Sequence, residues 1–298
     1  MHVAITGSSG LIGRALTESL RADGHQVMRI VRSPEVPEGG ARWDPAAGTI
    51  DAEALVGVDA VVHLAGVGIA DSRWSDAHKH AVLDSRVDGT TVLAKAVAEI
   101  EGGPTVLLSG SAIGYYGDTG DDSVDESSPR GTGYLADVCV AWEEAAQPAV
   151  DAGLRVAFLR TGVVQSTDGG SLKKQLLPFK LGVGGRIGDG QQWISWISID
   201  DEVAAIRYLL DHDVAGPVNL TAPQPARNTE FTKALGKVLG RPTIFPVPTF
   251  ALKLILGGEA AESLALGSQK VLPTVLGEAG FDFAHDDIET GLRAVLGK

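Results

Sequence analysis

The sequence predicts an α/β fold, in which a doubly wound parallel sheet is joined to a smaller C-terminal lobe. In the first half of the 298 residues, short β-branched runs alternate with longer amphipathic segments, as in a parallel sheet covered by helices. A glycine-rich loop joins the first run to the first amphipathic segment. The length fits one such domain plus a lobe, and 44% hydrophobic residues suffice for a large core.

The alternation places the elements of this sheet along the chain. We expect strands at 2–6, 26–31, 59–64, 104–110, 155–160 and 217–220, and helices near 11–22, 75–100 and 133–152. Residues 162–193 are rich in glycine, so we expect one or two long loops that fold over a site. Beyond Pro223 we expect a helix at 230–239, a proline-punctuated segment at 241–248 and a last helical block.

The loop after the first strand has the spacing of a phosphate-binding turn. Gly7, Gly10 and Gly13 form a G-x-x-G-x-x-G pattern between the predicted strand and the predicted helix. Glycines let the backbone pass close beneath a pyrophosphate, and a helix N-terminus offers free N–H groups and a positive dipole end. We therefore expect a dinucleotide to bind here. The expected contacts are Gly7, Ser9, Gly10, Leu11, Ile12 and Gly13.

The end of the second strand indicates which dinucleotide binds. NAD sites usually have a carboxylate there for the ribose hydroxyls, whereas this chain reads Val31, Arg32, Ser33. A guanidinium suits a 2′-phosphate, so we expect NADP as the cofactor, with these three residues in contact with it. The alternative is that Arg32 is an ordinary solvated arginine.

Small residues also end the next predicted strand. Leu64, Ala65 and Gly66 follow it, as needed where the backbone passes beneath an adenine and ribose, although an ordinary tight turn would have the same residues. Taken together, these motifs assign residues 1–162 and 193–222 to an NADP-binding Rossmann domain. Residues 163–192 and 223–298 are then expected to form the substrate-binding lobe.

Composition excludes several classes of function. The net charge of −13 disfavours a nucleic-acid partner, and a single cysteine, Cys139, excludes an intrachain disulfide and a cysteine-cluster metal site. We expect no metal. The first strand begins at residue 2 and no apolar run is long enough to span a membrane, so we expect a cytoplasmic, soluble protein without a membrane partner. The apolar run at 250–256 is short and contains Lys253, so we interpret it as packed core.

Motifs spread along nearly the whole chain match a known family. They lie at residues 43–51, 64–66, 73–74, 85–87, 114–117, 177–179, 182–185, 195–197, 219–223 and 241–242. With them the chain resembles the extended short-chain dehydrogenase/reductases, the NAD(P)-dependent epimerase/dehydratase superfamily. Within it, the chain is similar to the sugar-nucleotide-epimerase-related, cell-division-inhibitor-like branch.

The resemblance implies catalytic residues, with one departure. The superfamily uses a serine, a tyrosine and a lysine four residues after that tyrosine, and these positions fall on Ser111 and Tyr134. The lysine position is then Val138; in a register shifted by one, the pair would be Gly133 and Asp137. The lysine is missing in both registers, and without a cation a tyrosine keeps a pKa of about 10 and is a poor base. The alternative is that Tyr134 packs under the nicotinamide or in the core.

Further positions follow from the same resemblance. Ser109 on the serine strand and Val163 after the 155–160 strand are expected cofactor contacts. Arg86 stands where the superfamily often has asparagine, and it would either contact the cofactor or form a surface ion pair. Ser198 stands where related sequences tend to have histidine.

The function we expect is that of an NADP-binding oxidoreductase or epimerase-like enzyme of the extended short-chain dehydrogenase type. Its substrate would be a small molecule, either a sugar nucleotide or a small carbonyl compound, and the protein could form a homodimer. The missing lysine supports an alternative: an NADP(H)-binding regulatory protein with little or no turnover.

Overall fold

The computed structural model describes residues 1–298 and is built around one eight-stranded sheet. Its strand order is β12-β8-β6-β5-β1-β2-β3-β4, and all neighbours are parallel except β3 and β4. The strands are β1 (His2–Thr6), β2 (Gln26–Val31), β3 (Ala41–Asp44), β4 (Thr49–Ile50), β5 (Ala60–His63), β6 (Val106–Ala112), β8 (Arg155–Thr161) and β12 (Gly216–Leu220). The predicted doubly wound α/β class is confirmed.

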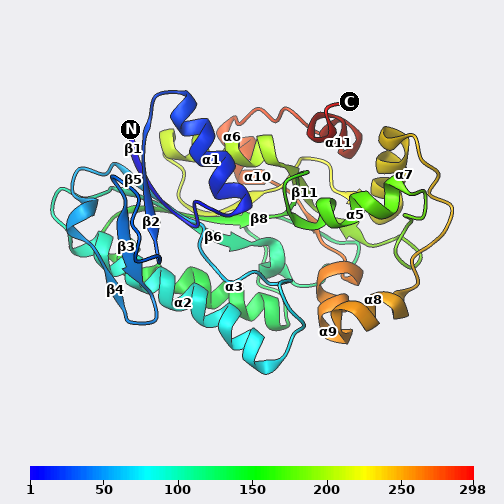
Figure 1. The fold of residues 1–298 in the computed structure, drawn as a ribbon, viewed down its shortest axis with the longest axis horizontal. Coiled ribbons are helices and arrows are strands. Elements are labelled where there is room, and N and C mark those ends of the chain that lie inside the picture. The colour runs from blue at the N-terminus through cyan, green and yellow to red at the C-terminus, as the bar shows by residue number, and fades with distance from the viewer.

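Helices cover both faces of this sheet (Figure 1). On one face lie α1 (Leu11–Ala22) and α6 (Ile199–Asp211), which pack against each other. On the other face lie α2 (Asp76–Glu99), α3 (Tyr134–Glu144) and α4 (Gln147–Asp151). Successive strand residues point to opposite faces, so Val3 and Ile5 join the first core and Ala4 joins the second.

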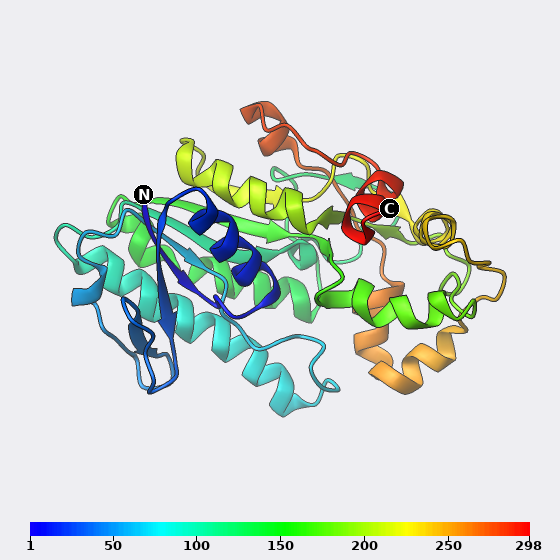
Figure 2. The same cartoon turned by 45° about the horizontal axis from the view of Figure 1, so that its top comes forward.

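A third core holds the C-terminal lobe together, at the end of the molecule away from β4 (Figure 2). It includes Leu172, Phe179, Trp196, Phe231 and Leu292. The helices of this half are α5 (Gly170–Lys180), α7 (Asn228–Leu239), α8 (Thr249–Leu256), α9 (Gly258–Ala261), α10 (Thr274–Ala279) and α11 (Ile288–Leu296). Of these, α10 packs against β12 of the main sheet.

Three pairs of short strands and three helical turns complete the chain. β9 (Val163–Gln165) pairs with β11 (Trp196–Ser198), β10 (Trp193–Ile194) with β13 (Ala226–Arg227), and β7 (Ser123–Val124) with β14 (Lys270–Val271). The helical turns are Glu53–Leu55, Ile113–Tyr116 and Glu262–Leu266.

The structure corrects several expected elements. Residues 162–193 are not only loops, because they contain β9 and α5; Leu172, Leu176 and Phe179 give α5 a buried face at helical spacing. The helix expected at 133–152 is divided into α3 and α4, with Pro148 in the first turn of α4. The packing expected for 250–256 is wrong, because α8 has no buried residue. No helix combines the length and the apolar character needed to cross a bilayer.

Candidate functional site

The glycine loop after β1 is in close contact with two other segments. Gly7 has a φ of +65°, and a Cβ there would lie 2.7 Å from the carbonyl carbon of Leu64. A Cβ on Gly13 would lie 2.3 Å from the carbonyl oxygen of Gly7. Neither position has room for a side chain, so the start of α1 lies directly against the loop that follows β1, and that loop lies directly against the loop that follows β5.

The N-terminus of α1 is free to receive an anion. Gly10 is the N-cap, no side chain caps the helix, and the first turn has no acidic residue. Among the protein's own groups, the N–H of Gly10 donates to Gly7 and that of Arg14 to Gly10, whereas those of Leu11 and Ile12 find no acceptor. Free N–H groups and the helix dipole together favour a phosphate here, so the residues present fit a dinucleotide pyrophosphate.

The end of β2 presents an unpaired cation at the same edge of the sheet. The Arg32 side chain is exposed and takes part in no hydrogen bond or ion pair, while the Ser33 hydroxyl accepts from the N–H of Glu35. Val31 is half-buried. Arg29 also lies here, and its Nε donates to Oγ of Ser8 at 3.0 Å. No sequence motif predicted this contact; the only signal was a charged residue within an apolar strand.

A threonine fixes the loop that follows β5. Oγ1 of Thr6 accepts from the N–H groups of Leu64 (3.1 Å) and Ala65 (3.2 Å), and lies 2.7 Å from Nδ1 of His63. Because the hydroxyl accepts both N–H groups, its own proton is free for Nδ1. Burial, and then the nearby charge of Arg86, lower the pKa of His63 to about 4, which keeps the imidazole neutral. No sequence motif pointed to Thr6 or His63.

The side chain of Arg86 packs against Gly66. Its Nη1 donates to the carbonyl oxygens of Val67 and Val82, both at 3.0 Å, and its guanidinium lies 4.7 Å from the centroid of the Trp142 ring. Burial lowers the pKa of Arg86. The alternative of a surface ion pair is wrong, because this guanidinium pairs with no carboxylate. Arg86 instead holds the 64–67 loop through its hydrogen bond to Val67. Its contact with the cofactor stays a prediction.

The two expected catalytic hydroxyls have separate partners. The Ser111 hydroxyl donates to Oε1 of Glu143 at 2.7 Å. The Tyr134 hydroxyl donates to the carbonyl oxygen of Lys79 at 2.8 Å, and burial raises its pKa although the charge of Arg86 opposes this. Val138, four residues after Tyr134, is buried in α3. The catalytic roles of Ser111 and Tyr134 stay predictions.

The remaining expected cofactor contacts lie at the same edge of the sheet or close to it. Ser109 is in register with His63, and its buried hydroxyl has no partner within the protein. Ser9 is exposed in the glycine loop. Val163 is half-buried and pairs with Trp196 just after β8. The carboxyl ends of β1, β2, β5 and β6 therefore bring these residues to one edge, as parallel strands require.

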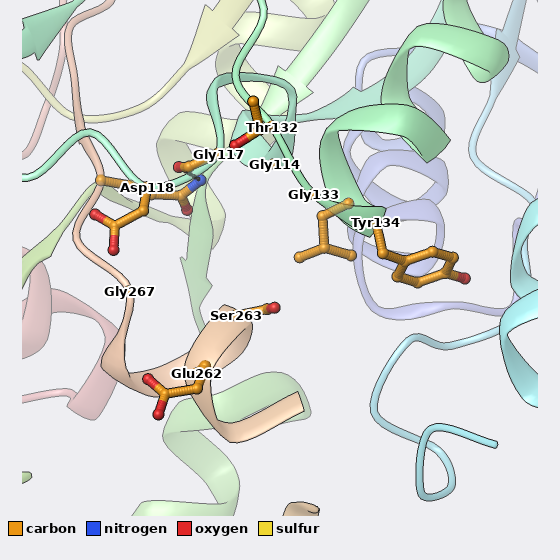
Figure 3. A pocket seen from close by; sticks show the side chains of 11 residues that line it. Gly114, Gly117, Asp118, Thr132, Gly133, Tyr134, Glu262, Ser263 and Gly267 are labelled. Carbon is orange, nitrogen blue, oxygen red and sulfur yellow. Dashed lines mark hydrogen bonds between the residues drawn. The ribbon is translucent and has the colours of Figure 1, made fainter. Parts of the chain in front are cut away.

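A cavity of about 180 Å³ adjoins Tyr134, between residues 114–118 on one side and 262–267 on the other (Figure 3). Its lining includes the carboxylates of Asp118 and Glu262 and no lysine or arginine. The lining residues are Gly114, Gly117, Asp118, Thr132, Gly133, Tyr134, Leu135, Glu262, Ser263, Gly267 and Gln269. The cavity thus lies between the main domain and the C-terminal segment, within reach of polar groups from both.

The first strand of the parallel sheet leads through a glycine loop into a helix without a side-chain cap. This arrangement is typical of a dinucleotide-binding α/β protein. The chain belongs to the NAD dependent epimerase/dehydratase family, because the sequence model of that family matches residues 3–221. A domain of unknown function, DUF1731, matches residues 247–295. The family resemblance inferred from the motifs is therefore confirmed.

Individual relatives agree with this assignment. An epimerase family protein of Mycobacterium bovis is 47% identical over 97% of this chain and 96% of that protein. The crystal structure of human epimerase family protein SDR39U1 with NADPH has a TM-score of 0.92 at 33% identity, covering 100% of both chains. A nucleoside-diphosphate sugar epimerase from Corynebacterium glutamicum has a TM-score of 0.81 at 41% identity; the match covers 100% of this chain and 58% of that one.

Proposed function

We propose that this protein binds NADP(H) and acts as an oxidoreductase or epimerase-like enzyme on a small molecule. The observation that carries this proposal is the unpaired Arg32 guanidinium beside the glycine cradle, at a strand end without a carboxylate. A 2′-phosphate would pair with this cation, and the free N–H groups of α1 would hold the pyrophosphate. The NADPH in the crystal structure of human SDR39U1 supports the same choice of cofactor.

When bound, NADP(H) supplies a hydride donor or acceptor, and the protein's own groups position it. Arg86 and Thr6 hold the 64–67 loop, over which the adenine and ribose would lie. Tyr134 lines the cavity and has a hydroxyl that could move a proton, but it has no lysine four residues on. In this chain a proton transfer through Tyr134 would therefore rely on other neighbouring cations: the charge of Arg86 acts to lower its pKa, and Nζ of Lys79 lies 5.0 Å from the centroid of its ring.

The cavity beside Tyr134 favours one of the two substrate classes. Its lining has two carboxylates and no cation, whereas a sugar nucleotide needs positive groups for its phosphates. The cavity therefore suits an uncharged, polar carbonyl compound better than a diphosphate.

The second candidate is a regulatory protein that binds NADP(H) with little or no turnover. It is favoured by Val138, a buried aliphatic side chain in place of the lysine, and by the use of the Ser111 proton in a bond to Glu143. The domain boundaries, a homodimer and a cytoplasmic location also stay predictions.

The experiment that tests the proposal identifies the nucleotide that co-purifies with the protein and titrates the nucleotide-free protein with NADPH and NADH. NADPH-selective binding followed by NADPH oxidation with a panel of carbonyl compounds supports the enzyme. Selective binding without turnover of any compound supports the regulatory alternative. If the protein binds neither NADPH nor NADH, both candidate functions are overturned.

A further inference from the structure

Two segments that are far apart in the sequence form one surface at the end of the C-terminal lobe. We call this surface the tip and define it as residues 170–188, which include α5, and residues 241–257, which include α8. The N–H of Val247 donates to the carbonyl of Arg186 at 2.7 Å, and the N–H of Gly188 donates back to Val247 at 3.1 Å. Figure 2 shows α5 and α8 at the same end of the molecule.

The charge of the tip is opposite to that of the rest of the protein. The whole chain has 38 Asp and Glu against 25 Lys and Arg. The two tip segments contain no Asp or Glu at all, and their cations are Lys173, Lys174, Lys180, Arg186, Arg241 and Lys253. Of these, only Lys253 forms an ion pair, with Glu262 outside the tip. The other five cations are exposed and without a carboxylate partner.

The tip also exposes most of the protein's large apolar side chains that face water. The exposed ones on the first segment are Leu177, Leu181 and Val183. Those on the second segment are Ile244, Phe245, Phe250, Leu254 and Ile255. Each is 60 to 76% exposed, and only five others exist in the whole chain. Such a concentration of apolar groups is typical of an interaction surface.

From these observations we infer that the tip is a peripheral docking surface for a membrane that contains anionic lipid. An interfacial helix binds a bilayer through buried apolar area and through attraction of Lys and Arg to anionic headgroups, and the tip supplies both. A surface contact needs no spanning segment, so this inference replaces the expectation of no membrane partner, which rested on the lack of such a segment.

Two other occupants fit the tip less well. A second copy of this chain, bound tip to tip, would bring two positively charged surfaces together, which is unfavourable. A folded protein partner would need pockets for side chains that protrude, whereas a fluid bilayer accepts them without shape complementarity. The chemistry of the tip therefore favours a lipid surface.

Flotation of the full-length protein with vesicles tests this inference. Vesicles of phosphatidylcholine containing about one third phosphatidylglycerol are compared with pure phosphatidylcholine. We expect binding to the anionic vesicles only, and loss of it when salt rises from about 0.1 M to about 1 M. Changing Lys173, Lys180 and Arg241 together to Gln should weaken binding roughly a hundredfold, at about fivefold per cation.

Matched variants distinguish an effect of the tip residues on vesicle binding from an effect of net charge and from misfolding. Changing Arg21, Arg42 and Lys95 together to Gln removes the same charge from other exposed sites and should leave vesicle binding within about twofold, since surface potential acts locally. Phe250→Ser with Leu254→Ser should abolish binding, whereas Val56→Ser with Val150→Ser should not. Thermal unfolding and NADPH titration of every variant report whether the fold is intact.

Several outcomes would overturn the inference. One is the absence of vesicle binding by the folded protein; another is an equal loss of binding in both triple variants. Equal binding to neutral vesicles would remove the role of the cations. Capture of an acidic protein through the tip, or concentration-dependent dimerisation through it, without binding to vesicles would assign the surface to a protein partner instead.

Discussion

The hydroxyl of Ser111 donates a hydrogen bond to Oε1 of Glu143, 2.7 Å away, and so faces a buried ion pair. Glu143 also accepts from Nε and Nη2 of Arg160, both at 2.8 Å, and Arg160 is in register with Ser111 on the neighbouring strand. Nη1 of Arg160 donates to the Tyr116 hydroxyl, which donates to Asn219. The serine expected to be catalytic is therefore one end of a polar network that joins β6, β8, β12 and α3.

We expect Glu143→Gln to destabilise the protein by about 3–5 kcal/mol, because it leaves the buried Arg160 guanidinium without its counter-charge. Urea unfolding measures the change. Glu144→Gln removes the adjacent, exposed carboxylate and should change the free energy of unfolding by less than about 0.5 kcal/mol. Equal stabilities of the two variants would show that the buried pair contributes nothing.

We predict that a preference for NADP over NAD depends on Arg32. We expect Arg32→Ala to weaken NADPH binding by about ten- to a hundredfold, since a charge-assisted hydrogen bond contributes about 1.5–3 kcal/mol, and to leave NADH binding unchanged. Isothermal titration measures both affinities. Arg21→Ala, at an exposed site in the last turn of α1, is the control and should bind like the wild type. Unaltered NADPH affinity in Arg32→Ala would refute the assignment of this side chain to the 2′-phosphate.

The glycine cradle allows a steric test. A Cβ on Gly13 would come within 2.3 Å of the Gly7 carbonyl oxygen, so Gly13→Ala has to move the loop away from α1. We expect NADPH affinity to fall about tenfold or more and stability to fall by about 1–3 kcal/mol. Gly277→Ala, in α10 with no atom within 4 Å of the added carbon, should be neutral or slightly stabilising. A Gly13→Ala variant with native NADPH affinity would contradict the tight contact.

A buried carboxyl group predicts a pH dependence of stability. Glu202 is fully buried, Oε1 accepts from the Thr161 hydroxyl, and Oε2 has no partner. Burial raises its pKa from 4.5 to about 8. Between these two values the folded state holds a proton that the unfolded state has lost, so this group makes the free energy of unfolding fall as pH rises.

The measurement is urea unfolding of wild type and variant at several values between about pH 6.5 and about pH 8; His63, whose unfolded-state pKa is about 6.5, contributes equally to both proteins and cancels in the comparison. Glu202→Gln cannot lose this proton, so its free energy of unfolding should fall less steeply than that of the wild type, by about 1.4 kcal/mol per pH unit. Glu18→Gln, at an exposed site on α1, should run parallel to the wild type. Parallel pH profiles for wild type and Glu202→Gln would mean that Glu202 is ionised in the folded protein.

The parts of the molecule that sequence reasoning predicted well are those set by local rules. The strand at 2–6 and the helix at 11–22 were predicted with their observed bounds, because a buried apolar run, a glycine loop and an amphipathic period lie next to one another in the chain. Local rules failed for α5, where the many surrounding glycines concealed the apolar spacing of Leu172, Leu176 and Phe179. They also failed for α8, whose apolar side chains were expected to be packed.

The sequence by itself determined the fold class, the glycine loop before α1 and the cation after β2, since each depends on residues within a few positions of one another. Only the tertiary structure decided what the other polar groups contact. Thr6 meets His63, Arg86 meets Val67 and Trp142, and Ser111 meets Glu143 through strand register and helix packing across tens of residues. The tip likewise exists only because residues 170–188 and 241–257 come together. Contacts of this kind depend on the relative placement of whole elements, and no local pattern of residue types encodes that placement.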